Sequence, residues 1–261
     1  MLKIINVLTL STAIATLTVA SARSQDHDLK PTVVLVHGAF AESSSWDAVI
    51  ARLTGDGYVA IAAANPLRSV ASDAASVAAI VRTIRGPVVL VGHSYGGPVI
   101  TEAANGNPNV KALVYVAGFM PDTGESSLTL SGKFPGSTLG SALAPVTLSD
   151  GTQDLYIQPS KFHLQFAADL SDDKAALMAS TQRPVAQVAL AEPSGAASWK
   201  LLPSYMIYGS ADRNIPPAAM QFMAERAHAA KTVVVEGASH ALMVSHPSEV
   251  TALIEEAASA R

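Results

Sequence analysis

The chain has 261 residues, of which 49% are hydrophobic and 15% charged, which is enough apolar sequence for one domain with a substantial core. The formal net charge is −4 and no run of Lys or Arg occurs, which argues against nucleic acid, an anionic membrane surface or a polyanion as partner. Cysteine is absent, so disulfides, thiolate catalysis and cysteine metal sites are excluded.

The N-terminus has the pattern of a secretory signal peptide over residues 1–22. Lys3 precedes an apolar stretch that ends in Ala20-Ser21-Ala22, a typical cleavage site. The alternative is a retained membrane anchor, but Thr and Ser residues dilute the stretch and make it a poor permanent span. We therefore expect an exported chain, periplasmic or extracellular, with no stable membrane span after cleavage.

Apolar strands and amphipathic helices alternate through the first half of the chain. Strands are predicted at residues 31–36, 58–64, 88–92 and 110–116, and helices at 45–53, 69–85 and from 95 to about 105. Continuous apolar strands in this alternation predict an α/β fold, with a mostly parallel central sheet flanked by helices.

The pattern changes after Gly118 and returns near residue 201. Residues 121–151 are rich in Gly, Pro, Ser and Thr, and helical stretches over 159–197 are broken at Pro184 and Pro193. Because structureless loops of this length are uncommon in compact domains, we expect residues 119–200 to form a partly helical cap. Residues 23–118 and 201–261 would form the core, with strands at 204–208 and 231–235 and helices at 216–229 and 247–258.

A Gly-x-Ser-x-Gly pentapeptide stands where a buried strand gives way to a helix. It reads Gly92-His93-Ser94-Tyr95-Gly96. A serine on so sharp a turn is held in strained backbone geometry, and small neighbours two positions away let the strand and helix approach closely. We therefore interpret Ser94 as a nucleophile lifted above the end of the sheet.

Two later loops carry the acid and base that such a serine needs. Asp212 lies four residues beyond the predicted strand ending at Tyr208, and His240 lies five beyond the one ending at Val235. Both loops follow core strands, where catalytic groups of open parallel sheets gather. Ser94, Asp212 and His240 are therefore the predicted catalytic residues, and Asp122 is the alternative acid.

Two backbone amides are predicted to form the oxyanion hole. One belongs to Tyr95, directly after the nucleophile at a helix N-terminus, and the other to Ala39, with Phe40 as the second choice. His37 is expected to brace this loop by a hydrogen bond, and His93 is expected to face away from the site.

Four segments together resemble the α/β-hydrolase superfamily: VLVHGAF, LVGHSYGG, YGSADRNIPP and EGASHALMVSHP. The chain is most similar to its cap-bearing esterase branch, which includes secreted bacterial hydrolases and, more distantly, plant methylesterases and hydroxynitrile lyases. The resemblance implies hydrolysis of carboxylic esters through an acyl-serine, without cofactor or metal. Those lyases place a lysine beside the catalytic histidine, and none is near His240, so lyase activity is a minor alternative.

The substrate is expected to be a small apolar ester bound in an apolar pocket. The predicted lining residues are Phe40, Phe119, Met120, Phe162, Phe166, Trp199 and Met243. Besides the lyase, two other functions fit the same scaffold: a cofactor-free perhydrolase or haloperoxidase, and a small-molecule receptor without catalysis. The sequence does not identify the acyl group, the alcohol or the oligomeric state.

Overall fold

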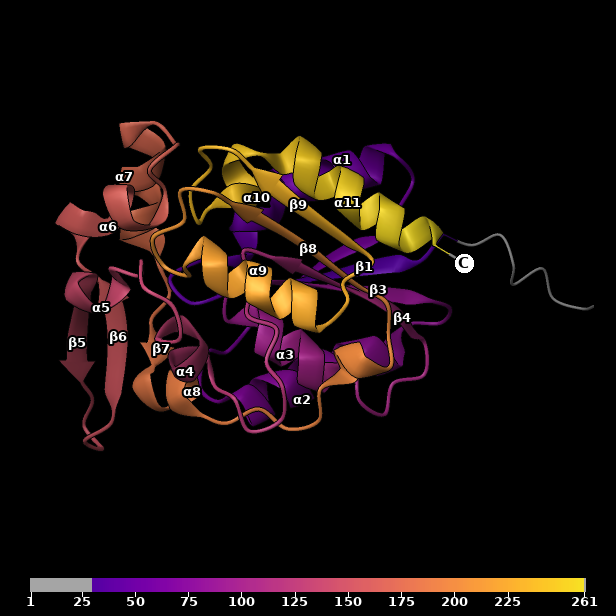
Figure 1. Cartoon of the computed structure of the whole chain (residues 1–261), viewed down its shortest axis with the longest axis horizontal. Coiled ribbons are helices and arrows are strands. Elements are labelled where there is room, and N and C mark those ends of the chain that lie inside the picture. Colours follow the sequence, from indigo (N-terminus) through magenta and orange to yellow (C-terminus); the bar gives the residue numbers. More distant parts are fainter. Residues whose placement is uncertain (1–29, 261) are drawn as a thin grey trace, which may run out of the picture.

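Six short segments form one parallel sheet in the computed structural model, which describes residues 30–260 (Figure 1). The signal-peptide prediction for residues 1–22 lies outside the described residues. The strands are β1 (Thr32–Val36), β2 (Ala60–Ala63), β3 (Val88–His93), β4 (Val110–Val116), β8 (Ser204–Gly209) and β9 (Lys231–Val235).

The strand order is β2-β1-β3-β4-β8-β9, and every neighbouring pair is parallel. Every residue of β3 is buried, as expected for a central strand covered by helices on both faces. The predicted strands at 110–116 and 231–235 match β4 and β9 at both ends. The predicted α/β fold class is confirmed.

Helices cover both faces of this sheet. They are α1 (Asp47–Gly55), α2 (Val70–Thr83), α3 (Gly96–Ala103), α9 (Pro217–Arg226), α10 (Leu242–Ser245) and α11 (Pro247–Ser259), with the short 3-10 helix η1 (Ser43–Trp46). In Figure 1, α1 and α11 lie on one side of the strands, and α2, α3 and α9 lie on the other. The sequence explains α2 well, because the Ser69 hydroxyl caps its N-terminus and its buried residues recur at helical spacing.

Between β4 and β8 the chain builds a separate layer of helices and a small sheet. Its elements are α4 (Ser127–Ser131), α5 (Leu139–Ala142), β5 (Leu143–Thr147), β6 (Gln153–Ile157), α6 (Pro159–Phe166), α7 (Asp172–Thr181), β7 (Val185–Ala186), α8 (Gln187–Ala191) and the 3-10 helix η2 (Ser198–Lys200). The predicted helices are present. The antiparallel sheet β5-β6-β7 was not predicted, because β5 is largely exposed and contains Pro145, which lacks a donor for strand pairing.

Charged side chains fix this insertion to the core. The Arg68 guanidinium contacts an Asp154 carboxylate oxygen at 2.7 Å and donates to the Pro184 carbonyl at 3.1 Å. The Glu192 carboxylate accepts hydrogen bonds from the first two amides of α2, at 2.7 and 3.2 Å. A carboxylate is favourable there because a helix N-terminus has unpaired N–H groups and a positive dipole end.

Among residues 30–260, none of the helices combines the length and the hydrophobicity that a membrane crossing requires.

Candidate active site

Ser94 sits on the sharp turn between β3 and α3. Its φ is +52°, in the left-handed region that side chains rarely adopt, and the residue is 7% exposed. A Cβ at Gly92 would lie 2.5 Å from the Gly96 carbonyl oxygen, and one at Gly96 would lie 2.5 Å from the Val36 carbonyl oxygen. Only glycine fits at these two positions, so the pentapeptide is required by the close approach of β1, β3 and α3.

Asp212 and His240 form a buried pair on the loops after β8 and β9. His240 Nδ1 lies 2.6 Å from Asp212 Oδ2, and both side chains have no exposed surface. The other Asp212 oxygen accepts the backbone N–H groups of Asn214, at 2.7 Å, and Ile215, at 3.0 Å. These bonds fix the carboxylate, which in turn fixes the histidine ring with Nε2 as its free nitrogen.

His240 Nε2 has no hydrogen-bond partner among residues 30–260, and no bond joins it to Ser94 Oγ in this structure. Catalytic hydrogen bonds are often long without substrate and shorten in the complex. The insertion supports the histidine loop from the other side. The Phe166 ring packs edge-on against the His240 ring at 5.0 Å between centroids, and the Phe166 carbonyl accepts the Ala241 N–H at 3.0 Å.

The alternative acid, Asp122, points to other partners. Its carboxylate contacts Lys200 Nζ, and the ion pair is partly exposed to solvent. The Lys200 ammonium holds the pKa of Asp122 below its usual value. The structure brings Asp212, not Asp122, to His240.

The predicted oxyanion donors differ in whether their backbone N–H groups are already hydrogen-bonded. The Phe40 N–H donates to the Arg183 carbonyl at 3.0 Å. Within the described part of the chain, the amides of Ala39 and Tyr95 donate to no acceptor. Both residues line one cavity with Ser94, and Tyr95 occupies the N-cap position of α3, where the helix dipole favours an anion.

His37 braces the Ala39 loop. Its Nε2 accepts the Asn65 N–H at 3.1 Å, its Nδ1 lies 3.0 Å from the Gly38 carbonyl, and Asn65 Nδ2 donates to the His37 carbonyl at 2.9 Å. Burial lowers the pKa of His37 to about 4, so the ring is neutral near pH 7, with its single proton on Nδ1.

His93 does not face away from the site, which corrects the expectation above. It is fully buried, its Nε2 donates to the His240 carbonyl at 3.0 Å, and the two rings lie 4.7 Å apart. Burial, together with the neighbouring His240, keeps the pKa of His93 well below its ordinary value. The residue before the nucleophile therefore holds the loop that carries the histidine.

One buried contact near the nucleophile has no signal in the sequence. The Tyr95 hydroxyl donates to Asp73 Oδ2 at 3.0 Å, and the same carboxylate accepts the Arg68 N–H at 3.1 Å. Burial raises the pKa of the Asp73 carboxyl and of the Tyr95 phenol. The pair anchors the residue after Ser94 to α2, 22 positions earlier in the chain.

Ser94 opens onto a cavity of about 110 Å³ between the strand ends and the insertion. Of the predicted lining residues, Phe40 and Phe119 lie on it. The other five are not part of its wall: Met120, Phe162, Phe166, Trp199 and Met243. Phe162, for example, stacks on Phe166 at 5.0 Å behind the His240 ring. The sequence did not identify the aliphatic wall, which consists of Leu128, Leu139, Leu143, Leu190 and Ile215.

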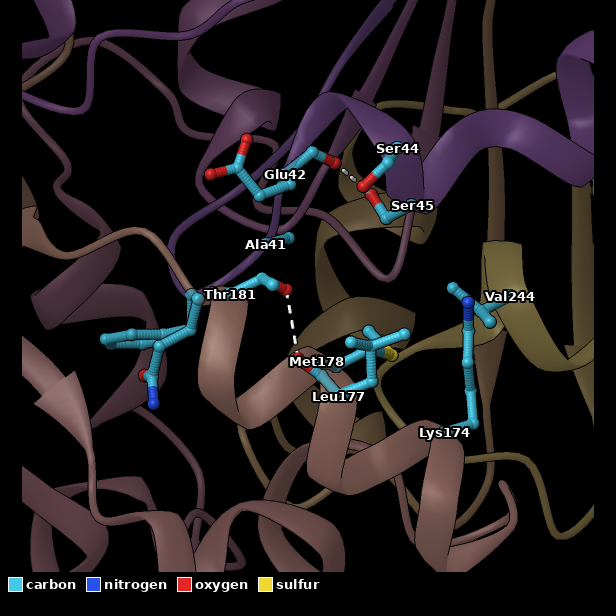
Figure 2. Close-up of a pocket in the computed structure, with 11 residues that line it drawn as sticks. Ala41, Glu42, Ser44, Ser45, Lys174, Leu177, Met178, Thr181 and Val244 are labelled. Carbon is cyan, nitrogen blue, oxygen red and sulfur yellow. Dashed lines mark hydrogen bonds between the residues drawn. The ribbon is translucent and has the colours of Figure 1, made fainter.

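A larger groove of about 370 Å³ lies between α7 and the loop before η1 (Figure 2). Lys174, Leu177 and Thr181 of α7 line one side of it, and the Lys174 side chain extends toward Val244. Ser94 lines the smaller cavity but not this groove, whereas Asp212 and His240 line neither, and among residues 30–260 Phe40 is the one residue common to both spaces. The smaller cavity is therefore the candidate active site. Residues 30–260 contain no group of three or more His, Asp or Glu side chains placed to hold a metal ion.

Comparisons with known proteins concern the fold of the chain as a whole. The model of the alpha/beta hydrolase family matches residues 33–253. The alpha/beta hydrolase nvfD of Aspergillus novofumigatus is 26% identical over 254 residues, covering 88% of this chain and 97% of that protein.

Two solved structures share the fold. Polyneuridine aldehyde esterase aligns with a TM-score of 0.76 at 20% identity, over 87% of this chain and 99% of that one. A pyrethroid hydrolase from Sphingobium faniae JZ-2 aligns with a TM-score of 0.70 at 21% identity, over 88% and 98%.

Proposed function

The chain belongs to the alpha/beta hydrolase family, and on that premise we propose that it is a serine hydrolase that cleaves small uncharged carboxylic esters through an acyl-serine on Ser94. The observation that carries the proposal is the buried His240–Asp212 pair, joined at 2.6 Å, on the same strand ends as the strained Ser94 turn. Polyneuridine aldehyde esterase and the pyrethroid hydrolase, whose names describe related reactions, share the fold.

In the first half of the proposed reaction, His240 Nε2 takes the Ser94 proton as Oγ attacks the ester carbonyl. The carbonyl oxygen becomes an oxyanion, which the Ala39 and Tyr95 N–H groups stabilise. Asp212 stabilises the imidazolium through the Nδ1 bond. His240 then returns the proton to the alkoxide oxygen, the bond between that oxygen and the carbonyl carbon breaks, and the alcohol leaves.

The second half releases the acid. His240 Nε2 takes a proton from water as the water oxygen attacks the acyl carbonyl, and the same two amides stabilise the new oxyanion. The bond to Ser94 Oγ breaks, and His240 returns its proton to that oxygen. The enzyme is restored, and each turnover consumes one water molecule.

The cavity limits the size of the group beside Ser94. In another protein a cavity of about 150 Å³ binds benzene, so 110 Å³ accepts a somewhat smaller group, about four carbons in length. Among residues 30–260, no charged residue lines this cavity, so an uncharged group is favoured, because burying an unpaired charge is costly.

Hydrolysis of p-nitrophenyl acetate tests the proposal. We expect turnover by the wild type and a loss of at least about a thousandfold in Ser94→Ala, with an unchanged circular dichroism spectrum. Ser76→Ala is the matched control, because Ser76 is an exposed serine in α2. Turnover retained by Ser94→Ala would refute the assignment.

We also propose that residues 1–22 are removed during export. N-terminal sequencing of the protein recovered from the periplasm or medium of an expressing bacterium should begin at Arg23. A chain that stays in the cell with Met1 intact would contradict this.

A further inference from the structure

Two buried polar side chains on the cavity wall are of interest, those of Ser127 and Asn214. Ser127, the first residue of α4, is 3% exposed, and its Oγ has no partner among residues 30–260. Asn214, on the loop after β8, is 2% exposed. Both line the same cavity as Ser94. A buried polar group without a partner is costly, so the free Ser127 hydroxyl in a mainly apolar site indicates a bonding role.

The hydrogen bonds of Gln165 fix the orientation of the Asn214 amide. Gln165 Nε2 donates to the Arg213 carbonyl at 2.8 Å, an oxygen that can only accept, and to Asn214 Oδ1 at 2.7 Å. Gln165 Oε1 accepts the Thr138 hydroxyl at 2.7 Å. Asn214 Oδ1 is therefore the acceptor, and its NH2 group donates to no residue of the described chain.

The same helix that carries Ser127 contacts Asn214 directly. One helical turn later, the Ser131 hydroxyl lies 3.5 Å from the Asn214 carbonyl, and the Ser137 hydroxyl donates to that carbonyl at 2.9 Å. Positions four apart share one face of a helix, so Ser127 and Ser131 face the Asn214 loop together. Ser127, Ser131, Ser137 and Asn214 thus form the polar part of a wall that is otherwise mainly apolar.

We propose that Ser127 and Asn214 bind a second oxygen atom of the substrate, in the part of the ester that occupies this cavity. The inference rests on the proposed ester hydrolysis and narrows it. An amide NH2 only donates and a hydroxyl can donate, so both suit an ether, carbonyl or hydroxyl oxygen. In the described part of the chain no Lys, Arg or His lines the cavity, so a carboxylate or phosphate is disfavoured. The favoured substrates are small uncharged esters with one further oxygen.

Matched ester pairs that differ by one atom test this. Methyl methoxyacetate and methyl butanoate differ by O against CH2 in the acyl group, and 2-methoxyethyl acetate and butyl acetate differ likewise in the alcohol. The ratio of kcat/KM within each pair is divided by the ratio of the hydroxide-catalysed rates, which removes intrinsic reactivity. In wild type we expect the oxygen-bearing ester to be favoured about three- to tenfold in one pair, which also identifies the part bound in the cavity.

Variants assign this preference to the two residues. In Ser127→Ala and in Asn214→Leu we expect the corrected ratio to fall toward one, because only the oxygen-bearing ester loses a hydrogen-bond partner. Ser141→Ala is the control, because Ser141 is an exposed serine of the insertion outside the cavity. It should leave both rates unchanged.

The outcomes separate the two proposals. Hydrolysis of all four esters without an oxygen preference in wild type, or a preference that survives in both variants, overturns the role of Ser127 and Asn214 while leaving ester hydrolysis intact. Hydrolysis of none of the esters, or full activity in Ser94→Ala, refutes the proposed function and this inference with it. The two variants are independent, so if one fails to fold, the other decides whether the preference depends on this part of the wall.

Discussion

The parallel-sheet core and the insertion of residues 119–200 meet at Ser94, and they contribute in different ways. The core places Ser94, Asp212 and His240 directly after three of its strands, and each position is fixed by backbone bonds or close packing. The insertion contributes no member of this group. It supplies cavity wall, including Phe119 and Ser127, and is tied to the core by ion pairs and caps. The core is thus suited to perform the chemistry and the insertion to select the substrate.

The largest difference between the two regions is expected when the candidate catalytic acid of each is changed to asparagine, Asp212 in the core and Asp122 in the insertion. In the core, Asp212→Asn should lower kcat for p-nitrophenyl acetate about ten-thousandfold, because a neutral amide no longer holds the His240 tautomer or stabilises its charge. In the insertion, Asp122→Asn removes only the partly exposed contact with Lys200 and should change kcat less than about threefold. Loss of activity in Asp122→Asn with retention in Asp212→Asn would reverse the assignment.

Acid should destabilise the core through its buried histidines. The folded-state pKa of His37 is about 4 against an ordinary 6.5, so the unfolded chain binds more protons in this interval. The contribution of neutral His37 to the free energy of unfolding is fully present above pH 6.5. It is lost as the pH falls toward 4, by up to about 3 kcal/mol.

Urea unfolding at several pH values between 4 and 6.5 measures how the free energy of unfolding changes with pH. This slope should be smaller in His37→Gln than in wild type. Part of the slope should persist, because burial also lowers the pKa of His93. An identical slope in wild type and His37→Gln would contradict the burial argument.

The tight junction between the two regions can be tested at Gly97. A Cβ there would lie 2.0 Å from the Phe119 carbonyl oxygen, so Gly97→Ala should destabilise the fold by about 1–3 kcal/mol and lower Tm by several degrees. Gly55→Ala is the control, because Gly55 has nothing within 4 Å of its added Cβ and lies in helix α1. Equal Tm values for the two variants would show that the junction is loose.

The smallest expected effect is on the hydrogen bonds that attach the insertion to the core. Glu192→Ala removes the carboxylate that accepts the first two amides of α2 and should cost about 1 kcal/mol of unfolding free energy. Glu236→Ala, at an exposed position with no such bond, should be neutral. If both variants unfold at the same denaturant concentration, Glu192 does not contribute to the attachment.

Sequence reasoning succeeded where local pattern determines structure. The apolar runs at 110–116 and 231–235 gave strands with correct ends, and the glycines around Ser94 marked a turn that the close approach of β1 and α3 requires. Asp212 and His240 could be chosen because each follows a core strand at a short distance. Their pairing in the structure agrees with that choice, and their catalytic roles stay predictions.

Sequence reasoning failed where contacts between segments far apart in the chain determine the structure. The β5-β6-β7 sheet lacks the apolar alternation of a buried strand, and β7 has only two residues. The orientation of His93 depends on the loop 147 positions later whose carbonyl it binds. The cavity wall is largely aliphatic because the insertion places Leu139 and Leu190 on the cavity that Ser94 lines. Phe166 packs against the His240 ring and does not line this cavity.

Covalent labelling tests the central claim, that Ser94 is the nucleophile activated by His240, most directly. The folded protein would be treated with a fluorophosphonate probe, digested, and the modified residue located by mass spectrometry. We expect a single adduct on Ser94, none in Ser94→Ala, and much slower labelling in His240→Ala. An adduct on another residue, or equal labelling of wild type and Ser94→Ala, would contradict it.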